Sequence, residues 1–371
     1  MKISKVLLLT AAALAASLVP NPLAAQLSAN VHVWVTGLNA PRGLKFGPDG
    51  KLYVAEAGTG GTTSTTCTQV IAPVGPYKGG NTSRISSINS AGTRTTFASG
   101  FPSSVDAMGD LLGVMDLAFM DGTLYALEGG GGCSHGNSMP NGVYSVNTKT
   151  GSWKLLANLS NFIQTHMVKY PNPPDFEPDG TFYSMVEFNN RLYAVEPNHG
   201  QIISVGTDGS MASVLDVSAS QGHIVPTAIT ARDGQLYLGN LNQFPIETRY
   251  ARILTLGYAE CSQVSAPGLD DTGAVHSLHV LSSKAGFTTV VGTTFGPDGL
   301  LYVLELSDAA GFPTPGDGKV VRVKADGSIE DVATGLSVPT AMTFGPDGKL
   351  YVSNFGAAPA GMGQIVQIDV P

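Results

Sequence analysis

Six hydrogen-bond acceptors occupy one position of a repeated segment, and their regular recurrence is the clearest chemical signal in the chain. Each acceptor is the last residue of a five-residue segment that starts with Leu-Tyr. The six residues are Glu56, Glu128, Glu196, Asn240, Glu305 and Asn354. Carboxylate and amide oxygens are ligands of Ca²⁺, so a ring of them could hold a metal. A residue that recurs in every unit can instead serve the unit, by accepting hydrogen bonds from backbone N–H groups where a strand enters its loop. We expect this capping role, and we keep Glu56, Glu128, Glu196 and Glu305, together with Asp116, as the alternative calcium ligands.

A second set of residues begins the apolar segments that precede each tight turn. It contains Arg42, Met115, Asp116, Tyr183, Ser184, Thr227, Val291 and Thr340. If these segments line a central channel, we expect Arg42, Asp116, Tyr183, Ser184, Thr227 and Thr340 to contact a ligand at its mouth. A purely structural or solvated role is the alternative for each of them. A hydrolytic metal cage needs three or more converging oxygen or nitrogen ligands, and this set offers only Asp116 as a good one.

Other catalytic signatures are missing from the sequence. The seven histidines show no HExxH or similar ligand spacing, and no GxSxG elbow is present. The glycine run at 129–133 is not followed by Lys-Ser/Thr, so it does not indicate a phosphate loop. Asp175, Glu177 and Asp179 lie close together before the third repeat, and we expect them to form an exposed acidic cluster.

Three cysteines allow one intramolecular disulfide and leave one thiol over. Cys67 and Cys133 lie in equivalent loops of consecutive repeats, so they are the expected pair. Cys261 would then be the spare thiol, and no motif places a histidine beside it.

The repeated segments predict an all-β fold. Six copies of the Leu-Tyr segment start at intervals of 44 to 72 residues, and each follows a tight turn that reads GPDG in its fullest form. Periods of about 40–50 residues with many short strands are typical of propeller blades, and longer intervals indicate blades with inserted loops. Third and fourth strands follow in each repeat. The prediction is a six-bladed β-propeller with four-stranded blades.

The two ends of the chain carry matching sequences. Residues 31–54 and 329–352 align without a gap and share 13 identities in 24 positions. The first stretch begins with a fourth strand that has no blade before it, and the chain ends after a third strand. We therefore expect residues 31–36 to complete the last blade and close the ring, which removes an exposed sheet edge.

Long connections are expected on one face only. They follow the second strands (57–82, 129–141, 241–250 and 306–318) or join blades (99–113, 161–182, 258–274 and 282–290). Both classes emerge on the same side of an up-and-down blade. Because loops on rigid scaffolds commonly carry function, this side is called the loop face and is the expected binding surface.

The first 25 residues resemble a secretory signal peptide, with Lys2 and Lys5 before an apolar run too short to span a bilayer. We expect export to the periplasm or the extracellular space, with residues 26–371 forming one domain and no membrane span. Removal of the two lysines would take the net charge from −8 to about −10. An acidic protein with few clustered cations is not expected to bind nucleic acid.

Four stretches of the chain read APRGLKFGPDGKLYVAEAGTGG, PPDFEPDGTFYSMVEFNNRLYAVE, VPTAITARDGQLYLGNLNQFP and GFTTVVGTTFGPDGLLYVLELSD. They resemble the ScyD/ScyE family of secreted bacterial proteins, which is related to NHL-type six-bladed propellers. They run in family order over nearly the whole chain, and LYLGNLNQFP is the most distinctive. The resemblance implies the propeller fold and an exported location. It implies no particular reaction.

Two functions fit these features. The first is a binding or scaffold protein that holds a small molecule, a glycan or a protein on the loop face. The alternative is an enzyme of the lactonase, lyase or strictosidine-synthase-like kind that acts at the channel mouth. One form of this alternative is an enzyme that depends on a bound Ca²⁺. Three or more carboxylate, amide or imidazole groups converging near Asp116 would favour the enzyme.

Overall fold

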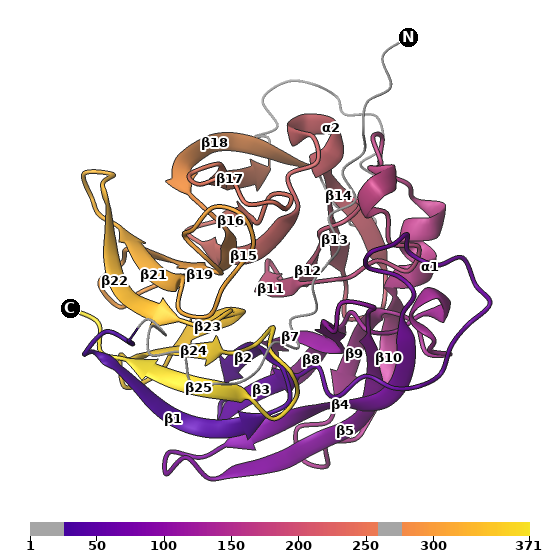
Figure 1. Ribbon diagram of the computed structural model, residues 1–371, viewed down its shortest axis with the longest axis horizontal. Helices are drawn as coiled ribbons and strands as arrows, with labels where there is room; N and C mark the ends of the chain where they lie inside the picture. The colour runs from indigo at the N-terminus through magenta and orange to yellow at the C-terminus, as the bar shows by residue number, and fades with distance from the viewer. Residues whose placement is uncertain (1–25, 259–276) are drawn as a thin grey trace.

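Six small antiparallel sheets surround a central axis, as predicted. The computed structural model describes residues 26–258 and 277–371, so the expected signal peptide, Cys261 and His276 lie outside the described residues. Each inner strand contacts the inner strand of the next blade, and the last one contacts the first. Figure 1 shows the resulting ring. The fold is a six-bladed β-propeller.

The strands of the first three blades follow one another along the chain. Blade one contains β2 (Pro41–Phe46), β3 (Leu52–Glu56), β4 (Lys78–Ile88) and β5 (Arg94–Val105), and its sheet gains the two-residue strand β6 (Leu111–Leu112). Blade two contains β7 (Val114–Met120), β8 (Thr123–Glu128), β9 (Gly142–Val146) and β10 (Trp153–Asn158), followed by α1 (Leu159–Thr165). Blade three contains β11 (Ser184–Phe188), β12 (Arg191–Glu196), β13 (Gln201–Val205) and β14 (Met211–Asp216), followed by α2 (Val217–Gln221).

The remaining blades include strands from both ends of the chain. Blade four contains β15 (Pro226–Arg232), β16 (Gln235–Asn240), β17 (Ala251–Tyr258) and β18 (Leu278–Phe287). Blade five contains β19 (Val290–Phe295), β20 (Leu301–Glu305), β21 (Gly318–Val323) and β22 (Ile329–Leu336). Blade six contains β23 (Ala341–Phe344), β24 (Leu350–Asn354), β25 (Gly363–Ile368) and, as its outer strand, β1 (Val31–Leu38).

The predicted closure of the ring is confirmed. Strand β1 pairs antiparallel with β25, and Val35 lies opposite Ile365. The two strands run side by side in Figure 1, one from each end of the chain. Because β1 continues directly into β2, this pairing makes the chain itself link the last blade to the first.

The repeated FGPDG-x-LYV segment is explained by two local interactions. In the turn, the Asp49 carboxylate accepts hydrogen bonds from the Lys51 N–H (3.2 Å) and the Tyr53 hydroxyl (3.2 Å), and Gly50 adopts a φ of 76° that other residues resist. Asp298 and Asp347 bind the corresponding tyrosines in blades five and six at 2.9 Å. The same sequence therefore forms the same turn in blades one, five and six.

The tyrosine and the phenylalanine of the repeat also join neighbouring blades. Tyr53 of blade one packs edge-on against Phe119 of blade two, with ring centroids 5.4 Å apart. Equivalent pairs link blade four to five and five to six, with centroids at 4.9 and 5.0 Å. Tyr351 of blade six meets Phe46 of blade one at 5.0 Å. The two identical nonapeptides thus supply the two rings of the closing interface, where edge-to-face pairs are favourable.

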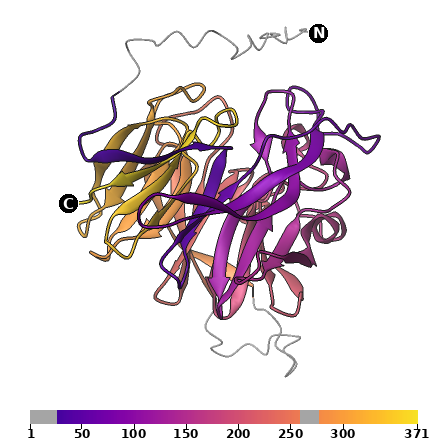
Figure 2. The same cartoon turned by 90° about the horizontal axis from the view of Figure 1, so that it is seen from below.

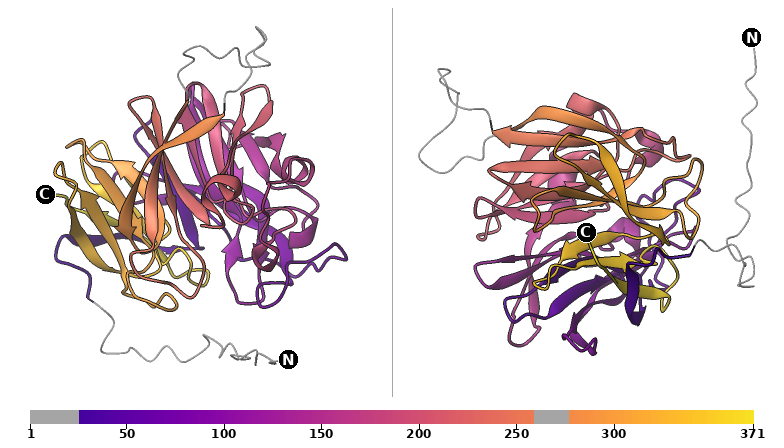
Figure 3. Two further views of the ribbon diagram at one scale, coloured as in Figure 1. Left: turned by 90° about the horizontal axis from the view of Figure 1, so that it is seen from above. Right: turned by 90° about the vertical axis from the view of Figure 1, so that its left-hand side faces the viewer.

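The side views show the molecule edge-on, with the connection that follows β3 extending from one face (Figures 2 and 3). Two of the predicted connections between blades are wrong. Strands β17 and β18, which flank the one predicted at 258–274, belong to the same sheet, and its residues from 259 on lie outside the described residues. Most of the one predicted at 282–290 belongs to strand β18. Within the described residues, no helix is long and apolar enough to cross a membrane.

Candidate functional site

The six repeated acceptors are buried and bind the backbone of their own blade. Four accept a hydrogen bond from an N–H in the segment that leads into the inner strand: Glu56 from Asn39 (2.7 Å), Glu196 from Thr181 (3.2 Å), Glu305 from Thr288, and Asn354 from Ser337 (2.7 Å). Asn240 instead donates to the Ile224 carbonyl, and Glu128 accepts from Gly130. In five blades the side chain fastens the entry segment to the second strand, and in blade two Glu128 caps the start of the loop that follows its own strand.

The residue opposite each acceptor on the third strand differs between blades. Arg84 forms a bidentate pair with Glu56, with nitrogen–oxygen distances of 3.0 and 2.8 Å, and Lys319 lies 3.8 Å from Glu305. Opposite Glu128 stands Gly142, and the Glu128 Oε2 has no partner among the described residues. Burial raises the pKa of Glu128 well above its usual value, which favours the neutral acid.

None of these carboxylates converges on a common point. In the residues that the structure describes, no three His, Cys, Asp or Glu side chains are grouped as metal ligands. Each acceptor faces the backbone of its own blade, so the ring geometry supports capping rather than calcium binding by Glu56, Glu128, Glu196 or Glu305.

The hydroxyl groups predicted at the channel mouth bond to the neighbouring blade. Ser184 of blade three donates to the carbonyl of Thr227 in blade four, and Thr227 donates to the carbonyl of Val290 in blade five. Thr340 of blade six donates to the Pro41 carbonyl of blade one at 2.7 Å. Each hydroxyl satisfies a backbone acceptor at the start of the next inner strand. These three residues join blades, and their donors are already used.

Asp116 makes the equivalent connection from blade two to blade three. Its carboxylate accepts hydrogen bonds from the Leu117 N–H and from the Met185 N–H, both at 2.8 Å. Gly43 of blade one packs so closely that an added Cβ would lie 2.0 Å from Asp116 Oδ1. Burial raises the pKa of Asp116. Asp116, the one acidic residue predicted at the channel mouth, is therefore held between three blades.

Tyr183 crosses the channel. Its hydroxyl donates to the carbonyl of Thr340, 2.9 Å away, and these residues belong to blades three and six, which are opposite in a ring of six. Val70 and Tyr77 from the connection after β3 pack with Tyr183 in one apolar cluster. The channel mouth is thus filled by a side chain and covered by a loop.

A small cavity remains along the axis. Arg42, Asp116, Tyr183, Ser184 and Thr340 line it, whereas Thr227 does not. About 30 Å³ is open to water-sized spheres, and since one water needs about 10–15 Å³ by this measure, it holds about two.

The acidic cluster before the third blade is not exposed as predicted. Glu177 and Asp179 are buried, with 3% and 6% of their surface exposed. Glu177 accepts a hydrogen bond from Tyr77 (3.2 Å) and lies 3.4 Å from His135 Nε2. Burial raises the pKa of Glu177, and the contacts with His135 and Tyr77 partly oppose this. The sequence pattern could not show that loops from two other repeats would cover these carboxylates.

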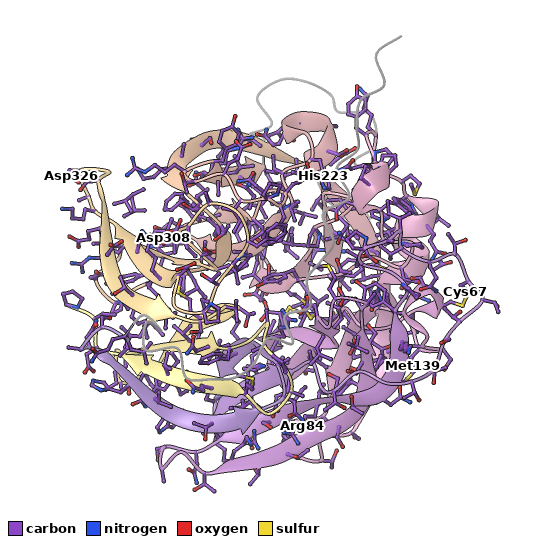
Figure 4. The ribbon with its side chains drawn as sticks, viewed as in Figure 1. Cys67, Arg84, Met139, His223, Asp308 and Asp326 are labelled. Atoms are coloured by element: carbon purple, nitrogen blue, oxygen red, sulfur yellow. A yellow bond between two sulfur atoms is a disulfide. The ribbon has the colours of Figure 1, made fainter. Side chains whose placement is uncertain are left out.

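The acidic residues fasten loops of four blades together. Asp179 accepts hydrogen bonds from the N–H (2.8 Å) and hydroxyl (2.6 Å) of Ser134 in the loop after β8. Asp175 lies 2.7 Å from Nε2 of His223, which is beside α2 (Figure 4). Cys67 and Cys133 form a disulfide, the pairing expected from their equivalent loops, at the edge of the molecule (Figure 4). The loop face is therefore held rigid over blades one to four.

Large apolar side chains are exposed mainly on this face. Ten are exposed among the described residues, and seven of them lie in loop-face connections: Ile71, Met108, Met167, Tyr170, Phe244, Tyr250 and Phe312. The other three lie on the outer strands β1, β10 and β18. This set was not predicted from the sequence, although isolated Phe and Met in long Pro-containing loops could have indicated it.

Two of these residues form a rigid aromatic pair, which we call the aromatic step. The rings of Phe244 and Phe312 are nearly parallel, 14° apart in plane and 5.9 Å between centroids, and 44% and 65% of their surfaces are exposed. Their loops are joined by two backbone hydrogen bonds between Ile246 and Gly311, at 2.6 and 3.0 Å. The step is thus built by blades four and five together.

Comparisons with known proteins agree on the fold. A protein from Thermus thermophilus, a proposed oxidoreductase (glucose dehydrogenase), superposes with a TM-score of 0.56 at 16% identity, over 91% of this chain and 99% of the other. A gluconolactonase from Xanthomonas campestris gives 0.52 at 10% identity, over 92% and 89%. The PQQ-bound aldose sugar dehydrogenase from Streptomyces coelicolor gives 0.51 at 14% identity, over 94% and 99%. No family model matches the sequence, and no curated protein matches it. At such low identity these similarities show the propeller fold alone.

Proposed function

We propose that this chain is a binding propeller that holds a macromolecular partner, a protein or a glycan chain, on its loop face. The observation that carries the proposal is the concentration of exposed apolar side chains there, seven of the ten found in the described residues. A contiguous exposed apolar patch is typical of an interaction site, and Phe244 and Phe312 stack to form one on this face. The seven residues come from five separate connections, which favours a macromolecular partner over one small molecule.

The aromatic step is the proposed anchor. Around it, Gln243, Glu247 and Arg249 are exposed and make no side-chain hydrogen bond within the described residues. Aromatic rings with adaptable polar neighbours are common at the centres of binding surfaces. Because two backbone hydrogen bonds between Ile246 and Gly311 already hold the two loops of the step together, little ordering entropy is lost on binding.

The alternative is an enzyme acting at the channel mouth, for example on a sugar or a lactone as the names of the similar structures suggest. The geometry supports it less, because Asp116 is already bonded to two backbone N–H groups and Tyr183 fills the channel. A Ca²⁺-dependent version would lose activity on chelation. Export of the protein and its membership of the ScyD/ScyE family are parts of the proposal that rest on the sequence resemblances alone.

Paired surface variants test the binding function. We expect F244S/F312S to lose the partner that the immobilised wild-type protein retains from the exported fraction of the native host. L155S/L281S, which removes two exposed leucines from outer strands, should retain it. Protein and polysaccharide in the eluates are quantified, and unfolding temperatures check that both variants fold. Equal retention by the two variants would argue against the loop face.

A further inference from the structure

Part of the connection after β3 lies over the channel mouth, and its residues 64–76 are called the lid. Val70 of the lid is 6% exposed and packs in one cluster with Met115 of blade two. Val74 of the lid and Tyr183 of blade three are packed against the same cluster. Met115 and Tyr183 also line the axial cavity. The inner side of the lid therefore covers residues that line this cavity at its loop-face end.

Few bonds fasten the lid to the rest of the molecule. At its base, Thr63 and Gly79 exchange backbone hydrogen bonds of 3.0 and 2.9 Å. Within the described residues, one backbone hydrogen bond joins the lid to a more distant segment, from the Ala107 N–H to the Val74 carbonyl at 2.9 Å. Residues 62–69 read TTSTTCTQ, so the outer half of the lid contains no large apolar side chain. Neither a sheet nor core packing holds this half in place.

The Cys67–Cys133 disulfide is the covalent tie of the outer half. It joins the lid to the short helix η1 (Cys133–His135) in the loop after β8, and Thr65 Oγ1 lies 3.3 Å from Cys133 Sγ. Both cysteines are exposed, at the edge of the molecule (Figure 4). Exposed disulfides are among those that thiols reduce most readily. Neither cysteine belongs to a strand, so breaking the bond leaves the sheets of the ring unchanged.

We propose that this disulfide is a redox latch that controls access to the axial channel. A thiolate of an external dithiol attacks one sulfur of the Cys67–Cys133 bond and forms a mixed disulfide, and the released cysteine takes up a proton. The second thiol of the dithiol then displaces the other cysteine. The protein gains two electrons and two protons in total, and the dithiol becomes a disulfide.

Reduction leaves the lid with few contacts. Val70 and Val74 still pack on the channel mouth, and the Ala107 hydrogen bond remains. These contacts must offset the conformational entropy that the whole segment loses when it is ordered, and its polar outer half contributes nothing to them. The reduced lid therefore opens and exposes Met115 and Tyr183 to solvent.

The latch goes beyond the partner binding proposed for the loop face. The aromatic step lies on blades four and five, where Ile246 and Gly311 tie its two loops to each other rather than to the lid. Opening the lid leaves the step in place. The two proposals therefore stand or fall separately.

Thiol labelling beneath the lid tests the opening. Met115 and Met120 lie near the two ends of β7 and are 3% and 5% exposed, but of the two only Met115 packs with the lid. M115C and M120C are made in C261S, which retains the disulfide, and in C67S/C133S/C261S, which lacks it. Without the disulfide, we expect a maleimide to label M115C about tenfold faster or more and M120C at an unchanged rate. An unchanged rate for M115C, or equal acceleration at both positions, would overturn the proposal.

Hydrogen exchange tests the latch without a new cysteine. In C261S, we expect reduction by dithiothreitol to speed amide exchange in residues 64–76 about tenfold or more, with β20 of blade five unchanged. C67S/C133S/C261S should exchange equally fast with and without the reductant. Alkylation counts the thiols that form in the folded protein. A disulfide that resists the dithiol, or a lid that still exchanges slowly once both thiols are free, would show a purely structural disulfide instead.

Discussion

Leu38→Ala is expected to lower the free energy of unfolding by about 2–5 kcal/mol, the usual cost of truncating a buried leucine. Leu38 is fully buried at the end of β1, and it packs in one cluster with Leu44 and Leu52 of blade one and Ile365 of blade six. The substitution therefore weakens the sheet that closes the ring and its contact with the first blade. Denaturant unfolding measures the effect.

Val33→Ala is the matched control on the same strand. Val33 is 47% exposed, so the change should stay within about 0.5 kcal/mol, as for most surface substitutions. If β1 did not belong to the ring, Leu38 would be as tolerant as Val33. Equal unfolding midpoints for the two variants would show that the strand is dispensable.

Glu56→Gln is expected to destabilise the protein by roughly 2–4 kcal/mol. Removing one partner of a buried ion pair costs about 3–5 kcal/mol because it strands the other charge, and Arg84 is 24% exposed, which lowers the figure. Glu56 also accepts hydrogen bonds from Asn39 N–H and Ser86, so the carboxylate joins three segments of blade one. The readout is the unfolding free energy at neutral pH.

Glu128→Gln is the matched change at the same position of the repeat. It is expected to increase the free energy of unfolding, whereas Glu56→Gln is expected to lower it. The pKa of Glu128 is raised in the folded protein above the ordinary value of 4.5. The folded state therefore binds more protons than the unfolded state above that pH, and wild-type stability falls as pH rises. The neutral amide removes this loss. E128Q should match the wild type near pH 4 and exceed it increasingly toward pH 8, and a gain that did not grow with pH would contradict the assignment.

The fold could be predicted because its determinants are local and repeated. The turns of blades one, five and six are each closed by an aspartate and a glycine within five residues, as Asp49 and Gly50 show. The aromatic contacts between blades use the same two residues of the repeat, a tyrosine and a phenylalanine. Tyr351 and Phe46 form this contact where the last blade meets the first. Matching stretches at the two ends therefore predicted the neighbouring position of the first and last blades.

The site could be predicted only in part, because it depends on contacts between repeats. Counting from the turns placed Ser184 and Thr340 correctly at the starts of the inner strands, but not the neighbouring carbonyls that their hydroxyls bind. Polarity suggested that Glu177 is exposed, yet Tyr77 and His135 from distant loops enclose it. The aromatic step requires two loops 68 residues apart, Phe244 and Phe312, to meet.

Site-specific photo-crosslinking in the native host tests most directly whether the loop face is the binding surface. A photoreactive amino acid replaces Phe312 on the loop face or Leu281 on an outer strand, two positions with similar exposure of 65% and 52%. If the loop face binds the partner, a discrete crosslinked partner is expected from position 312 and none from position 281. A partner captured from position 281, with none from position 312, would contradict it.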